Sequence, residues 1–161
     1  DSRAIHWMTT ARTAKLMLKE TEAEDQRIIT LAVFTVAADA EVATFERALS
    51  IAASLIDQLL KSGVRLRLLL GDQQEVMAEG NESPLHLFHA LALCERRPVD
   101  DSTAVQQALI STLVRSQDGP TLLIASWADP ALHDLFPGVD QILTPHTHKD
   151  LFDADGSGLP A

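Results

Sequence analysis

The sequence predicts an α/β fold, with a mostly parallel sheet that helices cover on both faces. Short apolar runs typical of buried strands occur at 28–34, 64–70 and 121–126. Helical patterns separate these runs, and the longest pattern begins near Phe45 and stops before Gly63. Strands that alternate with helices form right-handed βαβ units, so we expect the strands to lie parallel in one sheet.

The first half of the chain supplies the clearest elements. The run 28–34 is almost continuously apolar and rich in β-branched residues, which favours a strand buried on both faces. From 45 to 60 the apolar residues recur every three or four positions, which predicts a helix with one apolar stripe. Gly63 is expected just after its end. A second strand follows at 64–70, and 74–78 is predicted to return as a short antiparallel edge strand.

The second half repeats this order. Ser83 and Pro84 are expected to start one helix, and the acidic cap at 100–102 the next. A last strand is expected at 139–144, where Pro145 stops it. The first of these helices is expected to bury one apolar face, made of Leu85, Phe88, Leu91 and Ala92.

The predicted organisation is a single domain with two appendages. A chain of 161 residues with 46% hydrophobic and 22% charged residues is typical of one folded domain. We expect its body to span 27–152, and 1–26 to pack on that body, because the segment is too apolar for a loose tail. The end, 153–161, is rich in Gly, Asp and Pro and is expected to be flexible. A start at Asp1 suggests a mature product or a piece of a longer chain.

Composition narrows the class of partner and the compartment. The net charge of -10 argues against nucleic acid, because phosphate binding needs clustered Lys and Arg. No apolar run approaches the roughly 20 residues of a membrane-spanning helix. Cys94 is the single cysteine, so an internal disulfide is excluded. That usage fits a reducing compartment, and we expect a cytoplasmic location.

A spaced pattern near the start of the chain points to a family. The pattern consists of Arg3, Ile5, Trp7, Ala11, Arg12, Leu16, Lys19 and Glu20. It resembles the signature of the domain of unknown function 58 family, and the resemblance extends from residue 1 to about residue 71. It implies a von Willebrand factor A-like fold and a place in the carboxyl-terminal part of a longer protein. It also implies a MoxR-type AAA+ ATPase as protein partner and a parent protein that is often membrane-anchored.

The residues of this pattern also have ordinary structural explanations. Ile5 and Trp7 are expected to pack in a core or between domains rather than to hold a ligand. The planar guanidinium of Arg12 suits an ion pair with Glu20 or Glu22, which would order the segment.

The metal-ion-dependent adhesion site that the implied fold is known for is expected to be degenerate here. That site uses an Asp-x-Ser-x-Ser sequence at the end of the first strand. Phe34, Val36 and Ala38 stand at these positions and offer no side-chain oxygen to a hard cation. We therefore expect no metal and no cofactor. Substitute ligands are conceivable on loops expected near the same edge of the sheet: Asp39, Glu41, Ser83 and Asp129.

Other candidate chemistry is sparse. His146-x-His148 is a possible start of a zinc site, with Cys94 and His133 as further ligands, but the spacing matches no known zinc motif. Cys94 is better explained as a small buried apolar residue. His86 and His89 are expected to be exposed or partly packed. The sequence has no Gly-x-Gly-x-x-Gly, Walker A or Gly-x-Ser-x-Gly motif.

Three functions remain open from the sequence. The first is a non-catalytic protein-interaction module, which is the expected function. The second is a metal-dependent binder or enzyme that uses the carboxyl ends of the parallel strands, at 35–39, 126–129 and 144–146. The third is a structural domain that helps a membrane-anchored parent to oligomerise.

Overall fold

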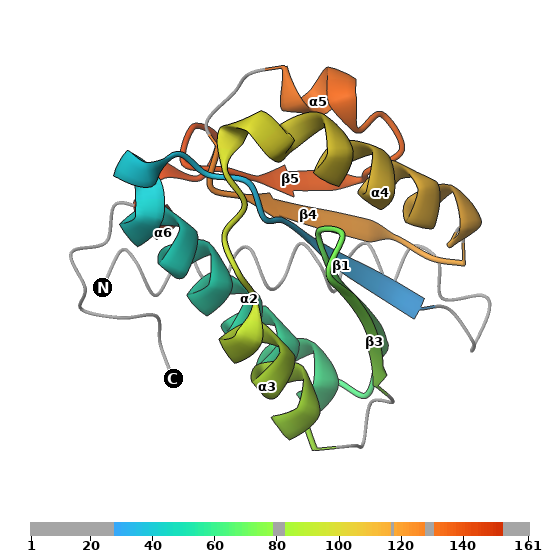
Figure 1. The fold of residues 1–161 in the computed structure, drawn as a ribbon. Coiled ribbons are helices and arrows are strands. Elements are labelled where there is room, and N and C mark those ends of the chain that lie inside the picture. The colour runs from blue at the N-terminus through green and yellow to red at the C-terminus, as the bar shows by residue number, and fades with distance from the viewer. Residues whose placement is uncertain (1–27, 79–82, 117, 128–130, 153–161) are drawn as a thin grey trace.

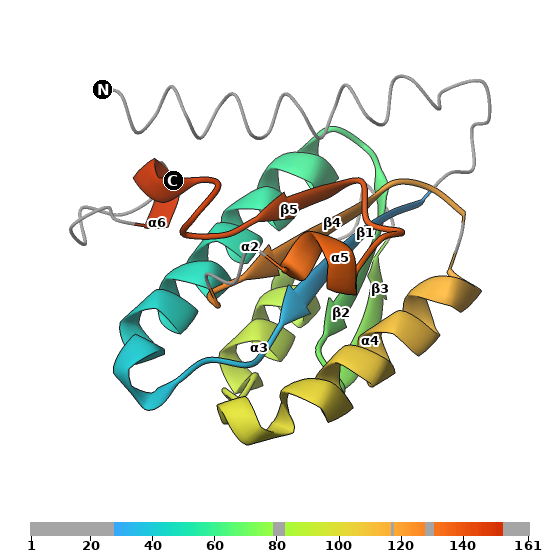
Figure 2. The same cartoon turned by 90° about the horizontal axis from the view of Figure 1, so that it is seen from above.

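The computed structural model describes residues 28–78, 83–116, 118–127 and 131–152. Within these ranges, one sheet has the strand order β3-β2-β1-β4-β5 (Figures 1 and 2). All neighbouring strands are parallel except β2 and β3. The strands are β1 Ile28–Phe34, β2 Arg65–Leu70, β3 Gln74–Ala78, β4 Thr121–Ala125 and β5 Gln141–Leu143. The predicted α/β class, the mostly parallel sheet and the antiparallel edge strand are therefore confirmed.

Helices cover the sheet on both sides (Figure 1). One face carries α2 (Val42–Lys61), α3 (Leu85–Leu93) and α6 (Lys149–Phe152), whose buried side chains share one apolar core. The other face carries α4 (Ser102–Arg115) and α5 (Leu132–Leu135), which close a second core. Two short 3₁₀ helices, η1 (Asp39–Glu41) and η2 (Val99–Asp101), precede α2 and α4. Two layers of helices bury the sheet, which explains why every residue of β1 is buried.

The central helix and the turns beside it follow the sequence pattern closely. The apolar stripe of α2 is buried from Phe45 to Leu60, as predicted. Gly63 ends this helix with a φ of 82°, a conformation that favours glycine. Gly71 ends β2 with a φ of 55°, and its N–H donates to the Val33 carbonyl over 2.9 Å. A side chain at Gly71 would collide with Thr35, so this turn into β3 needs glycine.

The buried face of α3 differs from the prediction. Leu87, Ala90 and Leu91 are buried, whereas Leu85 is 72% exposed and Ala92 is also exposed. Only Leu91 of the expected face is fully buried. Apart from its two histidines the helix is apolar on every side, so periodicity alone does not select the inward face. Contact with α2 and β3 selects it instead.

Some expectations concern residues that are not described. The N-terminal segment 1–26 and the tail 153–161 lie outside the described residues. So do the family-pattern residues Arg3, Ile5, Trp7, Ala11, Arg12, Leu16, Lys19 and Glu20. In the described part of the chain, no helix combines the length and apolarity needed to span a membrane.

Candidate functional site

The carboxyl ends of three parallel strands meet at one edge of the sheet. β1 ends at Phe34, β4 at Ala125 and β5 at Leu143. The segments that follow them, 35–39, 126–127 and 144–148, therefore lie at the same edge, where ligands bind in open α/β sheets. The hydroxyl of Ser126 reaches the Val36 carbonyl over 3.5 Å, which joins two of these segments.

Phe34 and Val36 face the core rather than this edge. Phe34 is 1% exposed, and its ring stacks on Trp127 at a centroid distance of 5.9 Å. The ring of Phe136 packs edge-on against the Phe34 ring at a centroid distance of 5.6 Å. Val36 is fully buried, and Ala38 is half-buried. These positions contribute packing, and none of the three side chains carries an oxygen that a cation needs.

The segment between α3 and η2 lies along the extension of β1. The Arg97 N–H donates to the Thr35 carbonyl over 2.8 Å, and the Ala37 N–H donates to the Arg97 carbonyl over 3.1 Å. These two bonds form a parallel bridge between Val36 and Arg97. The backbone at Arg97 is therefore fixed to the chain that leaves the central strand.

The Arg97 side chain joins two further loops. Its Nη1 donates to Asp72 Oδ1 over 2.7 Å, and its Nε donates to Asp101 Oδ2 over 3.0 Å. These hydrogen bonds, first to Asp72 and then to Asp101, raise the pKa of Arg97 further above its ordinary value. The turn after β2 and the start of α4 are thus held by one guanidinium.

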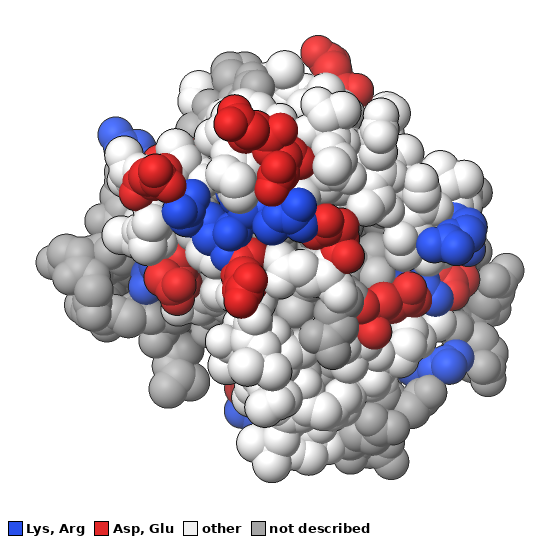
Figure 3. All heavy atoms as spheres, in the orientation of Figure 1, with Lys and Arg blue, Asp and Glu red and all other residues white. Residues whose placement is uncertain are grey.

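Arg96 completes this network. Its Nη1 donates to the Ala37 carbonyl over 2.6 Å, and its Nη2 donates to Asp39 Oδ1 over 2.7 Å. We call Asp39, Asp72, Arg96, Arg97 and Asp101 the arginine clamp. Figure 3 shows basic side chains with acidic ones around them on this face of the molecule. The clamp places two guanidinium groups, each paired with carboxylates, at the edge where the sequence led us to consider a cation.

Among the described residues the proposed substitute ligands do not assemble, and the Glu41 carboxylate accepts the Ala38 N–H over 3.3 Å. Asp39 is engaged by Arg96, and its side chain is 94% exposed. Ser83 lies at the opposite edge, because β3 runs antiparallel to β2 and carries the chain away from the carboxyl ends. Its hydroxyl accepts the Leu85 N–H over 3.4 Å. The expectation that Ser83 shares this edge is therefore wrong, and Asp129 lies outside the described residues.

The described histidines and Cys94 do not form a metal centre either. Across the described ranges, no three His, Cys, Asp or Glu side chains gather as a cation would require. His146 and His133 are exposed, as are His86 and His89. His86 Nε2 lies 3.0 Å from the Met77 carbonyl oxygen, so its ring has a structural contact.

Cys94 is a packing residue, although it is only partly buried rather than buried as expected. It follows α3 directly and lies against the larger apolar core. Burial raises the pKa of its thiol to about 11, and the nearby carboxylates of Glu46 and Glu95 add to the effect. A thiol with this pKa is protonated at neutral pH and is therefore a poor nucleophile and metal ligand.

A polar cleft lies beside the clamp, on the face of the sheet that α4 covers. Its volume is about 220 Å³. Asp72 belongs to both the clamp and the cleft, and Glu75 adds a second carboxylate. The remaining lining residues come from the end of β2, the β2–β3 turn and α4: Leu69, Gly71, Gln73, Ala108 and Thr112. The carboxyl-end surface is thus hollowed beside the clamp, and both carboxylates of the cleft are paired with arginines, Asp72 with Arg97 and Glu75 with Arg67.

A second ion-pair cluster lies towards the other end of the strands. Arg67 is 9% exposed, and its two Nη atoms donate to the Asp118 carboxylate over 2.8 and 3.0 Å. Its Nη1 also donates to the buried Thr30 hydroxyl over 3.3 Å. The hydrogen bonds from Arg67 lower the pKa of Asp118 below its ordinary value. This cluster ties β1 and β2 to the loop before β4.

Sequence reasoning missed both arginine clusters. Two adjacent arginines shortly after an apolar helix were a usable signal for the clamp. An arginine inside the apolar run RLRLLL was a usable signal for the Arg67 cluster. The sequence contained no comparable signal for the distant aspartates that pair with these arginines. Asp72 is 25 residues away from Arg97, and Asp118 is 51 residues away from Arg67.

Comparisons with family models, curated proteins and solved structures found no match to this chain.

Proposed function

We propose that this domain is a non-catalytic protein-interaction module that binds its partner with the carboxyl-end edge of the sheet. The arginine clamp is the observation that supports this proposal. It fixes three loops and the start of a helix in one arrangement. A surface that is already ordered loses less conformational entropy when a partner binds.

We further propose that the fold is von Willebrand factor A-like. The strand order, with one antiparallel edge strand and helices on both faces, supports this finer assignment. The resemblance of the N-terminal pattern to the domain of unknown function 58 family supports it independently. In this proposal the edge is a degenerate adhesion site, in which guanidinium groups hold the loops together.

The chemistry of the edge also suits a protein partner. Val42 and Val99 are 45% and 42% exposed, and they directly follow η1 and begin η2. Asp39, at the start of η1, projects its carboxylate into solvent. Apolar side chains beside charged groups are typical of protein interfaces, where a few residues supply most of the binding energy.

The proposed partner is a MoxR-type AAA+ ATPase, and this part rests on the family resemblance. The test is binding between the parent protein, with its upstream sequence restored, and the ATPase encoded beside it. Val99→Asp should raise Kd at least tenfold, because it places a charge in the interface. Leu85→Asp is the matched control. Leu85 is 72% exposed at the other end of the molecule, so this variant should bind like wild type.

Two results would contradict the proposal. One is no binding by biolayer interferometry when the full parent protein is present. The other is equal weakening by Val99→Asp and Leu85→Asp. Thermal melts of both variants check that a loss of binding does not reflect unfolding.

A further inference from the structure

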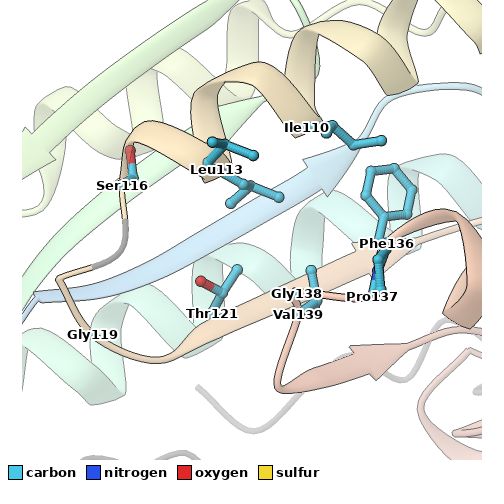
Figure 4. A pocket seen from close by; sticks show the side chains of 10 residues that line it. Ile110, Leu113, Ser116, Gly119, Thr121, Phe136, Pro137, Gly138 and Val139 are labelled. Atoms are coloured by element: carbon cyan, nitrogen blue, oxygen red, sulfur yellow. The ribbon is translucent and has the colours of Figure 1, made fainter.

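An apolar groove lies on the face of the sheet that α4 and α5 cover, apart from the clamp. It has a volume of about 300 Å³ and runs between α4 and the starts of β4 and β5 (Figure 4). Ile110, Leu113 and Val114 line it from α4, and Phe136 and Val139 from the loop before β5. Val114 is 63% exposed at the rim. Such a groove is favourable for apolar side chains that would otherwise meet water.

The described chain enters the body at one end of this groove. Ser116 and Gly119 lie at that end, away from Phe136 (Figure 4). The Ile28 N–H donates to the Asp118 carbonyl over 3.3 Å. Gly119 approaches the Ile28 carbonyl so closely that a side chain there would collide with it. The residues that precede Ile28 therefore join the body beside the groove.

The preceding segment has the length and chemistry to fill it. Twenty-seven residues precede Ile28, and they include the apolar run Leu-Met-Leu at 16–18. An extended chain covers about 3.3 Å per residue, so the ten residues from Leu18 to Ile28 reach roughly 33 Å. The groove wall between Ile110 and Ser116 is only about 9 Å of helix.

A cation at the groove rim can pair with the same occupant, and Asp118 and Asp140 also adjoin groove residues. Four acidic residues lie between the apolar run and Ile28: Glu20, Glu22, Glu24 and Asp25. The exposed side chain of Arg115 adjoins the groove residues Val114 and Ser116. Acidic residues that flank an apolar run would face a cation at the rim while the run itself is buried.

We propose that this groove is the docking site of the chain's own N-terminal segment, with residues 16–18 filling it. Docking there is independent of the clamp and of any partner bound to it. The segment that carries the family pattern would then be attached to the body through α4. Substitutions at the groove rim would release it without disturbing the sheet.

Hydrogen–deuterium exchange on the whole 161-residue chain tests this proposal. Backbone amides around 16–18 should exchange at least tenfold more slowly in wild type than in Val114→Asp. The control is Leu93→Asp, because Leu93 is 64% exposed on α3 and matches Val114 in exposure. It should leave the protection intact. Fast exchange in wild type, or equal protection in wild type and Val114→Asp, would overturn the proposal.

Disulfide trapping identifies the occupant directly. In a Cys94→Ser background, Val114→Cys is combined in turn with Leu16→Cys, Met17→Cys and Leu18→Cys. A disulfide needs Cα atoms within about 7 Å, so at least one pair should close within a single chain on oxidation. The same cysteines paired with Leu93→Cys should stay reduced. Failure of all three pairs, or dimers linked between chains, would overturn the proposal, and dimers would indicate a second copy as the occupant.

Discussion

At the scale of single residues, Thr35 is the most unusual group in the core. It is fully buried at the end of β1, and its hydroxyl has no hydrogen-bond partner among the described residues. Thr30, on the same strand, is also fully buried, but its hydroxyl accepts a hydrogen bond from Arg67. The two threonines share full burial, and one hydroxyl is satisfied whereas the other is not. Comparing them can measure the free-energy cost of burying a hydroxyl without a hydrogen bond.

Thr35→Val should stabilise the domain. Replacing the hydroxyl by a methyl group of similar shape removes a desolvation cost, so the free energy of unfolding should rise by about 1 kcal/mol. Urea denaturation measures this change. Thr30→Val is the control and should not stabilise, because it removes a hydrogen bond to a guanidinium. A Thr35→Val protein that is no more stable than wild type would show that the hydroxyl is satisfied in solution.

At the scale of elements, the Arg67–Asp118 pair is predicted to make the association of β1, β2 and the α4–β4 loop depend on pH. The Asp118 pKa is lower in the folded chain than its ordinary value of 3.8. A lowered carboxyl pKa stabilises the fold above the unfolded-state value, and this stabilisation is lost as pH falls through the folded-state value. The pair should therefore be fully effective at pH 7 and should weaken progressively as the pH falls below 3.8 towards the lowered folded-state pKa of Asp118.

Asp118→Asn tests this dependence. At pH 7 it should lower the free energy of unfolding by about 1 kcal/mol, a modest value because the carboxylate is 43% exposed. The difference from wild type should shrink as the pH falls below 4. Asp57→Asn is the control for removing a carboxylate from an ion pair, since Asp57 pairs with Lys61 on the surface of α2. A difference between Asp118→Asn and wild type that is the same at pH 3 and pH 7 would rule out this account.

The elements differ in how well the sequence predicts them. β1 and α2 were predicted closely because long apolar patterns specify both element and buried face. The prediction of which face of α3 is buried was wrong, because the residues of this helix are apolar in nearly every direction. Each arginine cluster includes a pair distant in sequence, Arg97 with Asp72 and Arg67 with Asp118, which no local pattern contains. Propensity and periodicity therefore predicted the sheet and its helices, whereas the contents of the candidate site required the folded chain.

At the scale of the whole molecule, the net charge of -10 raises the question of cation binding. Titration calorimetry with magnesium, manganese or calcium at physiological salt should give a flat trace. The side chains of Phe34, Val36 and Ala38 carry no oxygen, and Asp39 is engaged by Arg96. A one-to-one isotherm of micromolar affinity, abolished by Asp39→Ala, would contradict this expectation. It would also revive the metal-dependent alternative for this edge.

The arginine clamp has a consequence for control of the interface proposed at this edge. A guanidinium is part of the chain, so neither dialysis nor a chelator can remove it. Contacts made with this surface would then be indifferent to EDTA and to changes in free calcium. They would respond instead to ionic strength, because exposed charges are screened over about 8 Å at 0.15 M salt. An edge built in this way would be competent to bind at all times. Binding could then be regulated only through the partner or through ionic strength.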